Sequence, residues 1–153
     1  MSRQAEDMEQ MVAAARDAMA HAYAPYSRFA VGAAVLLSNG DIVTGANFEN
    51  ASYGLSLCAE AVALASANAS GRLREIQAIA LVGKALDAPT DGLVTPCGRC
   101  RQILNEAQQL AGRQITVYCA APEGSAVTVH TVSELLPFAF GSNNLGLNPE
   151  TKR

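Results

Sequence analysis

The chain has 153 residues, of which half are hydrophobic and 16% are charged. This length and composition predict one domain with enough apolar material for a packed core. The formal net charge of −3 argues against a nucleic-acid-binding surface, which is normally basic, and leaves small uncharged substrates open. No apolar run approaches the roughly 20 residues that span a bilayer, so we expect no membrane partner.

The first residues and the cysteines point to a reducing compartment. Residues 1–11 are polar and acidic, unlike a secretory signal peptide. Two of the four cysteines form a Cys-x-x-Cys motif. Without a secretion signal, that motif is more typical of metal or redox chemistry than of disulfides. We therefore expect a cytoplasmic protein.

The first third of the chain predicts a helix, a hairpin and a loop. Apolar residues recur at helical spacing over 6–22, which predicts an amphipathic helix. The apolar run 31–37 predicts a buried strand. The turn sequence Ser-Asn-Gly-Asp at 38–41 joins it to a returning strand over 42–46, so these two strands should be antiparallel. Residues 47–55 are polar, contain a glycine, and predict a loop.

The rest of the chain alternates helices and strands. The predicted elements are a helix over 58–69, a strand over 76–82, a loop over 83–95, a helix that starts near Pro96 and runs to Leu110, strands over 115–120 and 127–131, and a short helix over 132–136. This alternation favours a sheet between helix layers, in which strands joined by a helix should pair in parallel. The predicted fold class is α/β, a three-layer α/β/α sandwich with a mixed five-stranded sheet.

Three cysteines and one glutamate carry the chemical signal. Cys97 and Cys100 stand at i and i+3, which places both thiols on one side of a helix's first turn. There the helix dipole favours thiolates. Cys58 lies upstream and is followed two residues later by Glu60. Catalytic zinc sites commonly use three protein ligands and leave one position for water, and Glu60 is placed to take a proton from such a water.

These residues resemble a known family. Cys-x-Glu followed by Pro-Cys-x-x-Cys is similar to the zinc-dependent nucleoside and base deaminases. Residues 24–34, 45–54 and 134–140 resemble the small cytidine deaminases, and the likeness extends over residues 8 to 141. We therefore expect residues 1–141 to form a single catalytic domain. Residues 142–153 are expected to be a C-terminal tail, either mobile or an arm against a partner.

The resemblance implies a reaction and a cofactor. The reaction is the hydrolytic deamination of cytidine and deoxycytidine to uridine and deoxyuridine with release of ammonia, as in pyrimidine salvage. It implies one Zn²⁺ per chain, held by Cys58, Cys97 and Cys100. Glu60 would be the catalytic residue that moves protons between water, the pyrimidine ring and the departing amine.

The resemblance also implies substrate-binding residues. Asn47 and Glu49 match a pair that hydrogen-bonds the ribose hydroxyls, and Phe29 matches an aromatic residue that packs at the substrate. The backbone of Ala59 and the carbonyl of Thr95 match groups that contact the pyrimidine edge and the leaving amine.

Two further aromatic residues imply shared sites. Tyr53 and Phe140 match residues that reach the site of a neighbouring subunit. A site that needs Phe140 from a neighbour requires oligomerisation, and the resemblance implies a homotetramer.

The motif departs from the family at one position. Many members have arginine directly after the glutamate, where this chain has Ala61. Three thiolates and Zn²⁺ carry a formal charge of −1, which nearby positive charge should offset. We expect Arg99, inside the Cys-x-x-Cys, and Arg101 to supply that charge. The alternative is that Arg99 simply faces solvent.

Several other interpretations remain open at this stage. Cys97 and Cys100 alone would suit a redox dithiol. The motif Pro-Cys-Gly-Arg-Cys-Arg-Gln also resembles blasticidin S deaminase, and a non-catalytic zinc scaffold would need a fourth protein ligand. Cys119, on an apolar strand, is expected to be a core thiol rather than that ligand. His21 and His130 are not expected to bind the metal.

Overall fold

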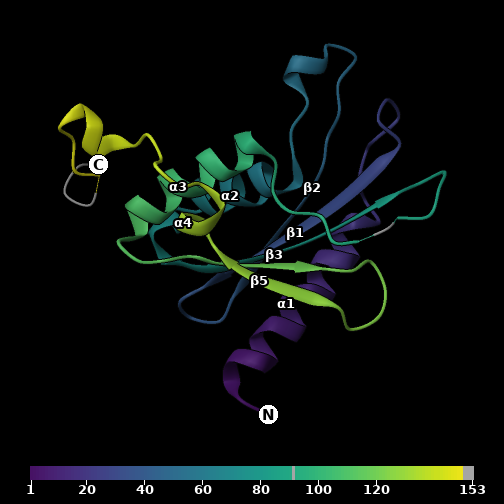
Figure 1. The fold of residues 1–153 in the computed structure, drawn as a ribbon, viewed down its shortest axis with the longest axis horizontal. Helices are drawn as coiled ribbons and strands as arrows, with labels where there is room; N and C mark the ends of the chain where they lie inside the picture. Colours follow the sequence, from purple (N-terminus) through teal and green to yellow (C-terminus); the bar gives the residue numbers. More distant parts are fainter. Residues whose placement is uncertain (91, 150–153) are drawn as a thin grey trace.

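A computed structural model describes residues 1–90 and 92–149. Its centre is a five-stranded sheet in the order β2-β1-β3-β4-β5, with helices on both faces (Figure 1). The strands are β1 (Phe29–Leu37), β2 (Ile42–Ala46), β3 (Ile76–Ala85), β4 (Thr116–Ala120) and β5 (Val127–Thr131). The helices are α1 (Arg3–Met19), α2 (Ala59–Ala69), α3 (Gly98–Ala111) and α4 (Val132–Leu135), with 3₁₀ turns η1 (Tyr53–Leu55), η2 (Leu73–Glu75) and η3 (Ser142–Leu145).

The strand pairing confirms a mixed sheet and corrects one detail. β1 is antiparallel to both β2 and β3, β3 and β4 are parallel, and β4 and β5 are antiparallel. The helix-linked strands β3 and β4 thus pair in parallel, as expected. The other helix-linked strands, β2 and β3, do not pair, because β1 lies between them. Most of β1 is buried, so it gains more from a partner on each side than from an edge position.

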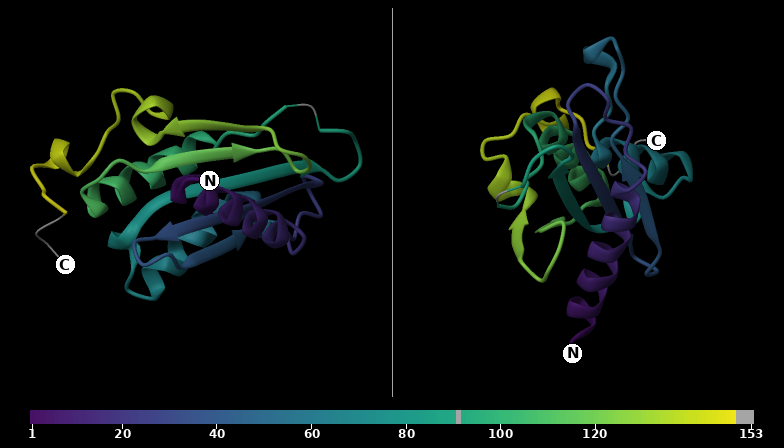
Figure 2. Two further views of the ribbon diagram at one scale, coloured as in Figure 1. Left: turned by 90° about the horizontal axis from the view of Figure 1, so that it is seen from below. Right: turned by 90° about the vertical axis from the view of Figure 1, so that its right-hand side faces the viewer.

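Two apolar cores lie on opposite faces of the sheet. One core joins α1 to the sheet through Met11, Val12 and Ala15. The other joins α2 and α3 to the opposite face through Ala63, Leu64 and Leu104 among others. Figures 1 and 2 show α1 separated from α2 and α3 by the sheet. The prediction of a three-layer α/β/α sandwich is therefore confirmed.

Two glycines let the helices approach the sheet closely. A Cβ on Gly32 in β1 would lie 1.9 Å from the carbonyl oxygen of Ala15 in α1. A Cβ on Gly45 in β2 would lie 2.4 Å from the carbonyl oxygen of Ala59 in α2. Neither distance is possible for a real Cβ, so each helix is seated where a strand has no side chain.

Several element boundaries differ from the predicted ones. α1 spans Arg3–Met19 rather than 6–22, because Ser2 caps it through a hydrogen bond from the Ala5 N–H and the Tyr23 N–H donates outside the helix, to the carbonyl of Asn47. β1 and β3 are longer than expected because Phe29 and Ala85 pair at the extended end of the ladder.

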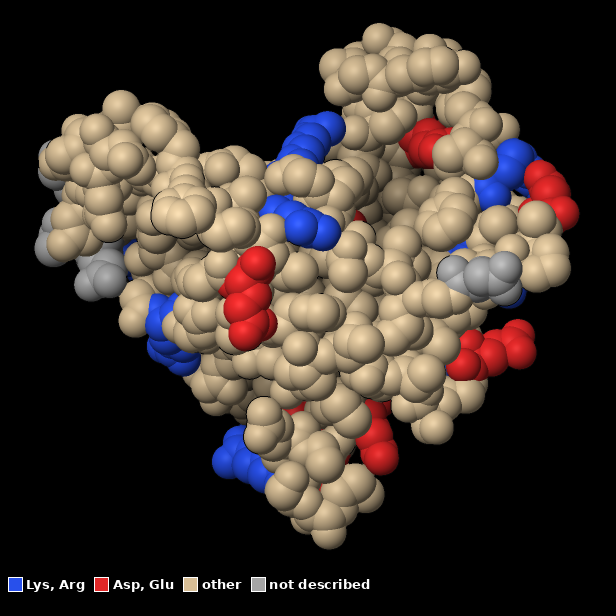
Figure 3. Space-filling model, viewed as in Figure 1, with Lys and Arg blue, Asp and Glu red and all other residues tan. Residues whose placement is uncertain are grey.

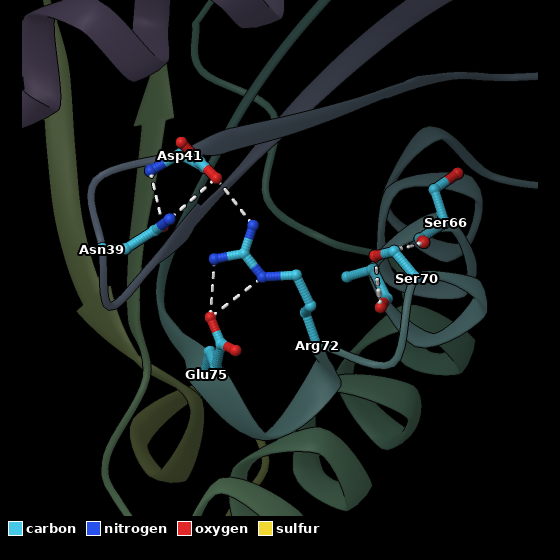
Figure 4. Close-up of polar contacts among 7 residues, drawn as sticks. Asn39, Asp41, Ser66, Ser70, Arg72 and Glu75 are labelled. Atoms are coloured by element: carbon cyan, nitrogen blue, oxygen red, sulfur yellow. Dashed lines mark hydrogen bonds and ion pairs between the residues drawn. The ribbon is translucent and has the colours of Figure 1, made fainter.

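A polar network joins two turns at one end of the sheet (Figure 4). Arg72, next to η2, donates to Asp41 of the β1–β2 turn at 2.6 Å and to Glu75 at 2.7 Å. Asn39 also donates to Asp41, at 2.8 Å. These hydrogen bonds from Arg72 and Asn39 lower the pKa of Asp41. The network ties the hairpin to the start of β3.

Two segments project from the sandwich. The connection between β2 and α2 forms an extended arm that contains η1, and the C-terminal segment runs beside α3 (Figure 1). The expected loop over 47–55 therefore includes a short 3₁₀ turn. The last residues of the expected tail, 150–153, lie outside the described residues. Within the described ranges, no helix has the length and apolar character to cross a membrane.

Candidate metal centre and active site

Three cysteine sulfurs converge between two helix starts. Cys58 is the N-cap residue of α2, Cys97 is the N-cap residue of α3, and Cys100 lies in the first turn of α3. Their sulfur atoms all lie within 4.8 Å of one another, and the Sγ atoms of Cys58 and Cys97 are 3.8 Å apart. Both N-cap cysteines precede their helices by one residue, whereas we had expected Cys58 inside the first turn and Pro96 at the helix start. The three sulfurs form a group that could hold a metal ion.

The other candidate ligands lie elsewhere. Within residues 1–90 and 92–149, the group of side chains that could hold a metal ion consists of the three cysteines. Cys119 belongs to the buried core on the α2–α3 side of the sheet, and burial raises the pKa of its thiol to about 11. This placement agrees with the expectation of a core thiol. Neither His21 nor His130 is part of the group.

The pKa values of Cys58 and Cys100 are shifted in opposite directions. Hydrogen bonding from Cys100 lowers the pKa of Cys58, and a weaker contribution comes from the positive charge of Arg99. The same interaction with Cys58, together with burial, raises the pKa of Cys100. The lowered pKa favours the thiolate of Cys58, which is the form that binds metals.

Glu60 lies beside this sulfur cluster. It is the second residue of α2 and only 4% exposed. Burial is the main cause that raises the pKa of its carboxyl, and the nearby Cys58 adds to the effect. A carboxyl with a raised pKa in a cavity is suited to take up and release protons during a reaction.

A cavity of about 300 Å³ opens at these residues. It is lined by Ser27, Phe29, Val31, Asn47, Glu49, Ser56, Leu57, Cys58, Ala59, Glu60, Leu81, Val94, Thr95 and Cys97. The cavity thus brings together Cys58, Cys97, Glu60 and five of the seven expected substrate residues, and the third expected ligand, Cys100, lies buried behind it within 4.8 Å of the other two sulfurs. The face drawn in Figure 3 is hollowed beneath the projecting arm, and its acidic and basic side chains are interspersed.

Asn47 and Glu49 line the cavity and hydrogen-bond to the backbone of residues 26–31. Asn47 accepts a hydrogen bond from the Val31 N–H and donates one to the Phe29 carbonyl, both at 2.9 Å. One amide N–H and one oxygen lone pair of Asn47 remain for another partner. Glu49 accepts from the backbone N–H groups of Tyr26 and Ser27 at 3.0 and 3.1 Å. Hydrogen bonds, chiefly from the Ser27 side chain, lower the pKa of Glu49 and keep it ionised.

Tyr53 and Phe140 do not reach the cavity of their own chain. Neither residue lines it, and they are 75% and 60% exposed. The Tyr53 ring packs against that of Tyr26, with ring centroids 5.6 Å apart. Their exposure leaves both rings available to another molecule.

Six lining residues were missed by the sequence analysis. They are Ser27, Val31, Ser56, Leu57, Leu81 and Val94. A period-two argument on β1 would have found Val31, because side chains two apart on a strand face the same way and Phe29 was already a candidate. No local pattern points to Leu81 or Val94, because they meet the cavity only through tertiary packing.

Two arginines surround the cluster. Arg99 is exposed but donates to the Ser56 carbonyl at 3.2 Å, so its side chain bridges α3 and the segment that leads to Cys58. Arg101 donates to the carbonyls of Pro96 and Leu135 at 2.7 and 2.9 Å, and to the Thr95 hydroxyl at 3.0 Å. Arg101 therefore fixes the backbone just before Cys97.

Comparisons with known proteins identify a family with a zinc-binding region. The family model for the cytidine and deoxycytidylate deaminase zinc-binding region matches residues 5–117. A cytidine deaminase from Halalkalibacterium halodurans is 45% identical over 91% of this chain and 98% of its own length. One from Mycobacterium tuberculosis is 40% identical over 86% of this chain and 87% of its own.

Solved structures give the same result. The crystal structure of cytidine deaminase from Burkholderia pseudomallei has a TM-score of 0.76 at 42% identity, and the match covers 92% of this chain and all of that one. The Mycobacterium tuberculosis enzyme has a TM-score of 0.69 at 38% identity, with 88% and 98% covered. This chain belongs to the cytidine and deoxycytidylate deaminase zinc-binding family.

Proposed function

We propose that this protein is a hydrolase that converts cytidine and deoxycytidine to uridine and deoxyuridine and releases ammonia. The observation that carries the proposal is a buried glutamate, Glu60, in a cavity beside three converging cysteine sulfurs. The cavity volume lies at the lower end of the range for small-molecule sites, which suits a nucleoside. Two relatives named cytidine deaminase align with this chain over 98% of their own length.

We propose Zn²⁺ as the metal, one per chain, held by Cys58, Cys97 and Cys100. Two sulfurs on a tetrahedral zinc with bonds of about 2.3 Å lie about 3.8 Å apart, and the Sγ atoms of Cys58 and Cys97 have this separation. A set of three thiolates also favours zinc over magnesium or calcium. When bound at such a site, zinc supplies hydroxide at neutral pH by lowering the pKa of water.

Glu60 would carry the protons. Its carboxylate takes one proton from the attacking water and delivers it to N3 of the pyrimidine as the C4–O bond forms. It then takes the second proton from the new hydroxyl and gives it to the amine, which leaves as ammonia when the C4–N bond breaks. The raised pKa of Glu60 suits a group that must hold a proton between these transfers.

The remaining lining residues would position the nucleoside. We propose that Asn47 and Glu49 bind the ribose hydroxyls, which the remaining donor and acceptor capacity of Asn47 and the ionised carboxylate of Glu49 support. Phe29 would pack against the substrate. The Ala59 backbone and the Thr95 carbonyl would contact the pyrimidine edge and the leaving amine.

We also propose a homotetramer in which Tyr53 and Phe140 complete a neighbouring site. Two largely exposed aromatic rings on projecting segments support this, since such rings are common where one chain contacts another. A role in pyrimidine salvage in the cytoplasm is part of the proposal. The four unpaired cysteines suit a reducing compartment.

The test is the ultraviolet change when the purified protein is mixed with cytidine, with deoxycytidine, cytosine, CMP and blasticidin S in parallel. We expect loss of the cytidine and deoxycytidine bands, and we expect a zinc chelator to abolish it. Turnover of blasticidin S alone would move the substrate while keeping the mechanism. No ultraviolet change with any of the five compounds, in a protein that binds one zinc per chain, would contradict the catalytic role and favour a zinc scaffold.

A further inference from the structure

The backbone around Phe140 is held by one stripe of α3. Gln102, Asn105 and Gln109 are spaced by three and four residues, so their side chains lie on one face of the helix. Gln102 donates to the Phe140 carbonyl at 2.8 Å and Asn105 donates to the same oxygen at 3.4 Å. The first of these contacts, from Gln102, lies two residues after Cys100. The helix at whose start Cys97 and Cys100 lie therefore also binds the backbone of Phe140.

Gln109 holds the next residues of the chain. Its Oε1 accepts hydrogen bonds from the Ser142 N–H at 3.2 Å and from the Ser142 hydroxyl at 2.9 Å. Ser142 is only 8% exposed, so these bonds satisfy buried donors. Gly141 lies directly over the Gln109 amide, where an added Cβ would be 2.3 Å from Nε2. A side chain at position 141 would therefore displace the end of the Gln109 side chain from Ser142.

The segment beyond Ser142 is anchored as well. The Gly141 N–H donates to the Asn144 side chain at 2.8 Å, and the Leu147 N–H donates to the Ser142 carbonyl at 3.0 Å, which closes the η3 turn. Arg74 then donates to the Pro149 carbonyl at 2.7 Å. These hydrogen bonds make residues 141–149 a docked strap that lies beside α3 (Figure 1).

The side chain of Phe140 contrasts with its backbone. The Phe140 carbonyl and the Ser142 N–H that follows it are both fixed to α3, yet the Phe140 ring itself is 60% exposed. Fixing backbone costs conformational entropy, and here that cost is not offset by burial of the ring in its own chain. The arrangement suits a ring that is held ready for a partner, because pre-organisation lowers the entropy lost on binding.

We propose that Gln109 is a positioning residue that, with the docked strap, presents the Phe140 ring to the cavity of a second copy of this chain. The inference rests on the proposed function, in which Phe140 contacts a nucleoside bound by a neighbouring subunit. Gln109 itself touches no substrate. It acts by holding Ser142 against α3 and so fixing the backbone that follows Phe140.

The test compares variants of the full-length zinc-loaded enzyme in steady-state cytidine kinetics. Gln109→Ala removes the acceptor, and Gly141→Ala displaces the Gln109 side chain without touching it chemically. Each should raise KM about tenfold, the size expected for a lost aromatic contact, while kcat stays within about twofold. Gln109→Glu keeps two acceptor oxygens and should retain the wild-type KM. Glu106→Ala, an exposed change on the same helix, is the matched control.

A double mutant separates this inference from the proposed function. Phe140→Ala should raise KM by a similar factor, and adding Gln109→Ala to it should change nothing more, because both act through the same ring. A normal KM in Phe140→Ala would overturn the substrate role of Phe140 and the inference with it. A raised KM in Phe140→Ala with normal values in Gln109→Ala and Gly141→Ala would overturn the inference alone. Additive effects, or loss of the oligomer in Gln109→Ala by size-exclusion chromatography, would also overturn it.

Discussion

At the scale of single residues, Glu60 combines burial with a place in the cavity. Glu60→Gln keeps the size of the side chain but cannot move protons. We expect kcat for cytidine to fall by about 10²- to 10⁴-fold, the usual contribution of a general acid–base group. Zinc content measured by atomic absorption should be unchanged, because the three sulfurs remain. Near-normal turnover in Glu60→Gln, with Glu106→Gln as control, would contradict the mechanism.

Arg99 is the residue that we expect to offset the thiolate charge. Its positive charge lowers the pKa of Cys58, and its bond to the Ser56 carbonyl keeps it near the cluster. Arg99→Ala should weaken zinc binding about tenfold, as for other groups that support metal ligands. The measurement is the rate at which a chromogenic chelator removes zinc. Arg99→Lys retains the charge and should lose zinc more slowly than Arg99→Ala; equal rates in all three proteins would refute the idea.

The sequence indicated the three clustered cysteines and Glu60 more directly than the rest of the cavity lining. Cys58, Cys97, Cys100 and Glu60 could be named because each sits at a defined offset in a short motif beside a helix start. Such spacings are local in sequence, so they can be recognised without knowledge of the fold. The hydrogen bonds that tie Asn47 to β1 could not be foreseen, because they depend on how the strands come together in space.

At the scale of elements, the contact between β1 and α1 depends on Gly32. Gly32→Ala would place a methyl group against the α1 backbone, so α1 must move. We expect the free energy of unfolding to fall by about 2–3 kcal/mol, as for other overpacked cores. Urea denaturation followed by circular dichroism measures this. Gly54→Ala, where an added Cβ meets nothing within 4 Å, should leave the unfolding midpoint nearly unchanged. An equally stable Gly32→Ala protein would show that α1 is not seated as described.

The order of elements was largely predictable, and the order of strands was not. The Ser-Asn-Gly-Asp turn fixed the β1–β2 hairpin, and the helix between β3 and β4 implied their parallel pairing. A helical connection gives the direction of the next strand but not its neighbour. The sequence therefore left open that β3 would pair with β1 instead of β2. The extra length of β3 has the same origin, because its end is set by its partner Phe29.

At the scale of the whole molecule, the shared-site proposal predicts complementation between subunits. Glu60→Gln subunits keep Phe140, and Phe140→Ala subunits keep Glu60. Tetramers that contain both should have some sites with Glu60 from one chain and Phe140 from another. At cytidine concentrations well below KM, co-expressed mixtures should exceed the average activity of the two separate variants. Activity equal to that average would place each site within a single chain.

The position of the three sulfurs also bears on how the chain folds. Cys58 starts a helix that follows β2, whereas Cys97 and Cys100 start a helix that follows β3. A zinc ion on all three would be a cross-link that closes a loop of chain containing α2 and β3. Because unfolding breaks the cluster, the stability of the fold should rise by about 1.4 kcal/mol for each tenfold increase in free zinc above the dissociation constant. The concentration of free zinc would then determine the fraction of chains that are folded as well as the fraction of sites that are active.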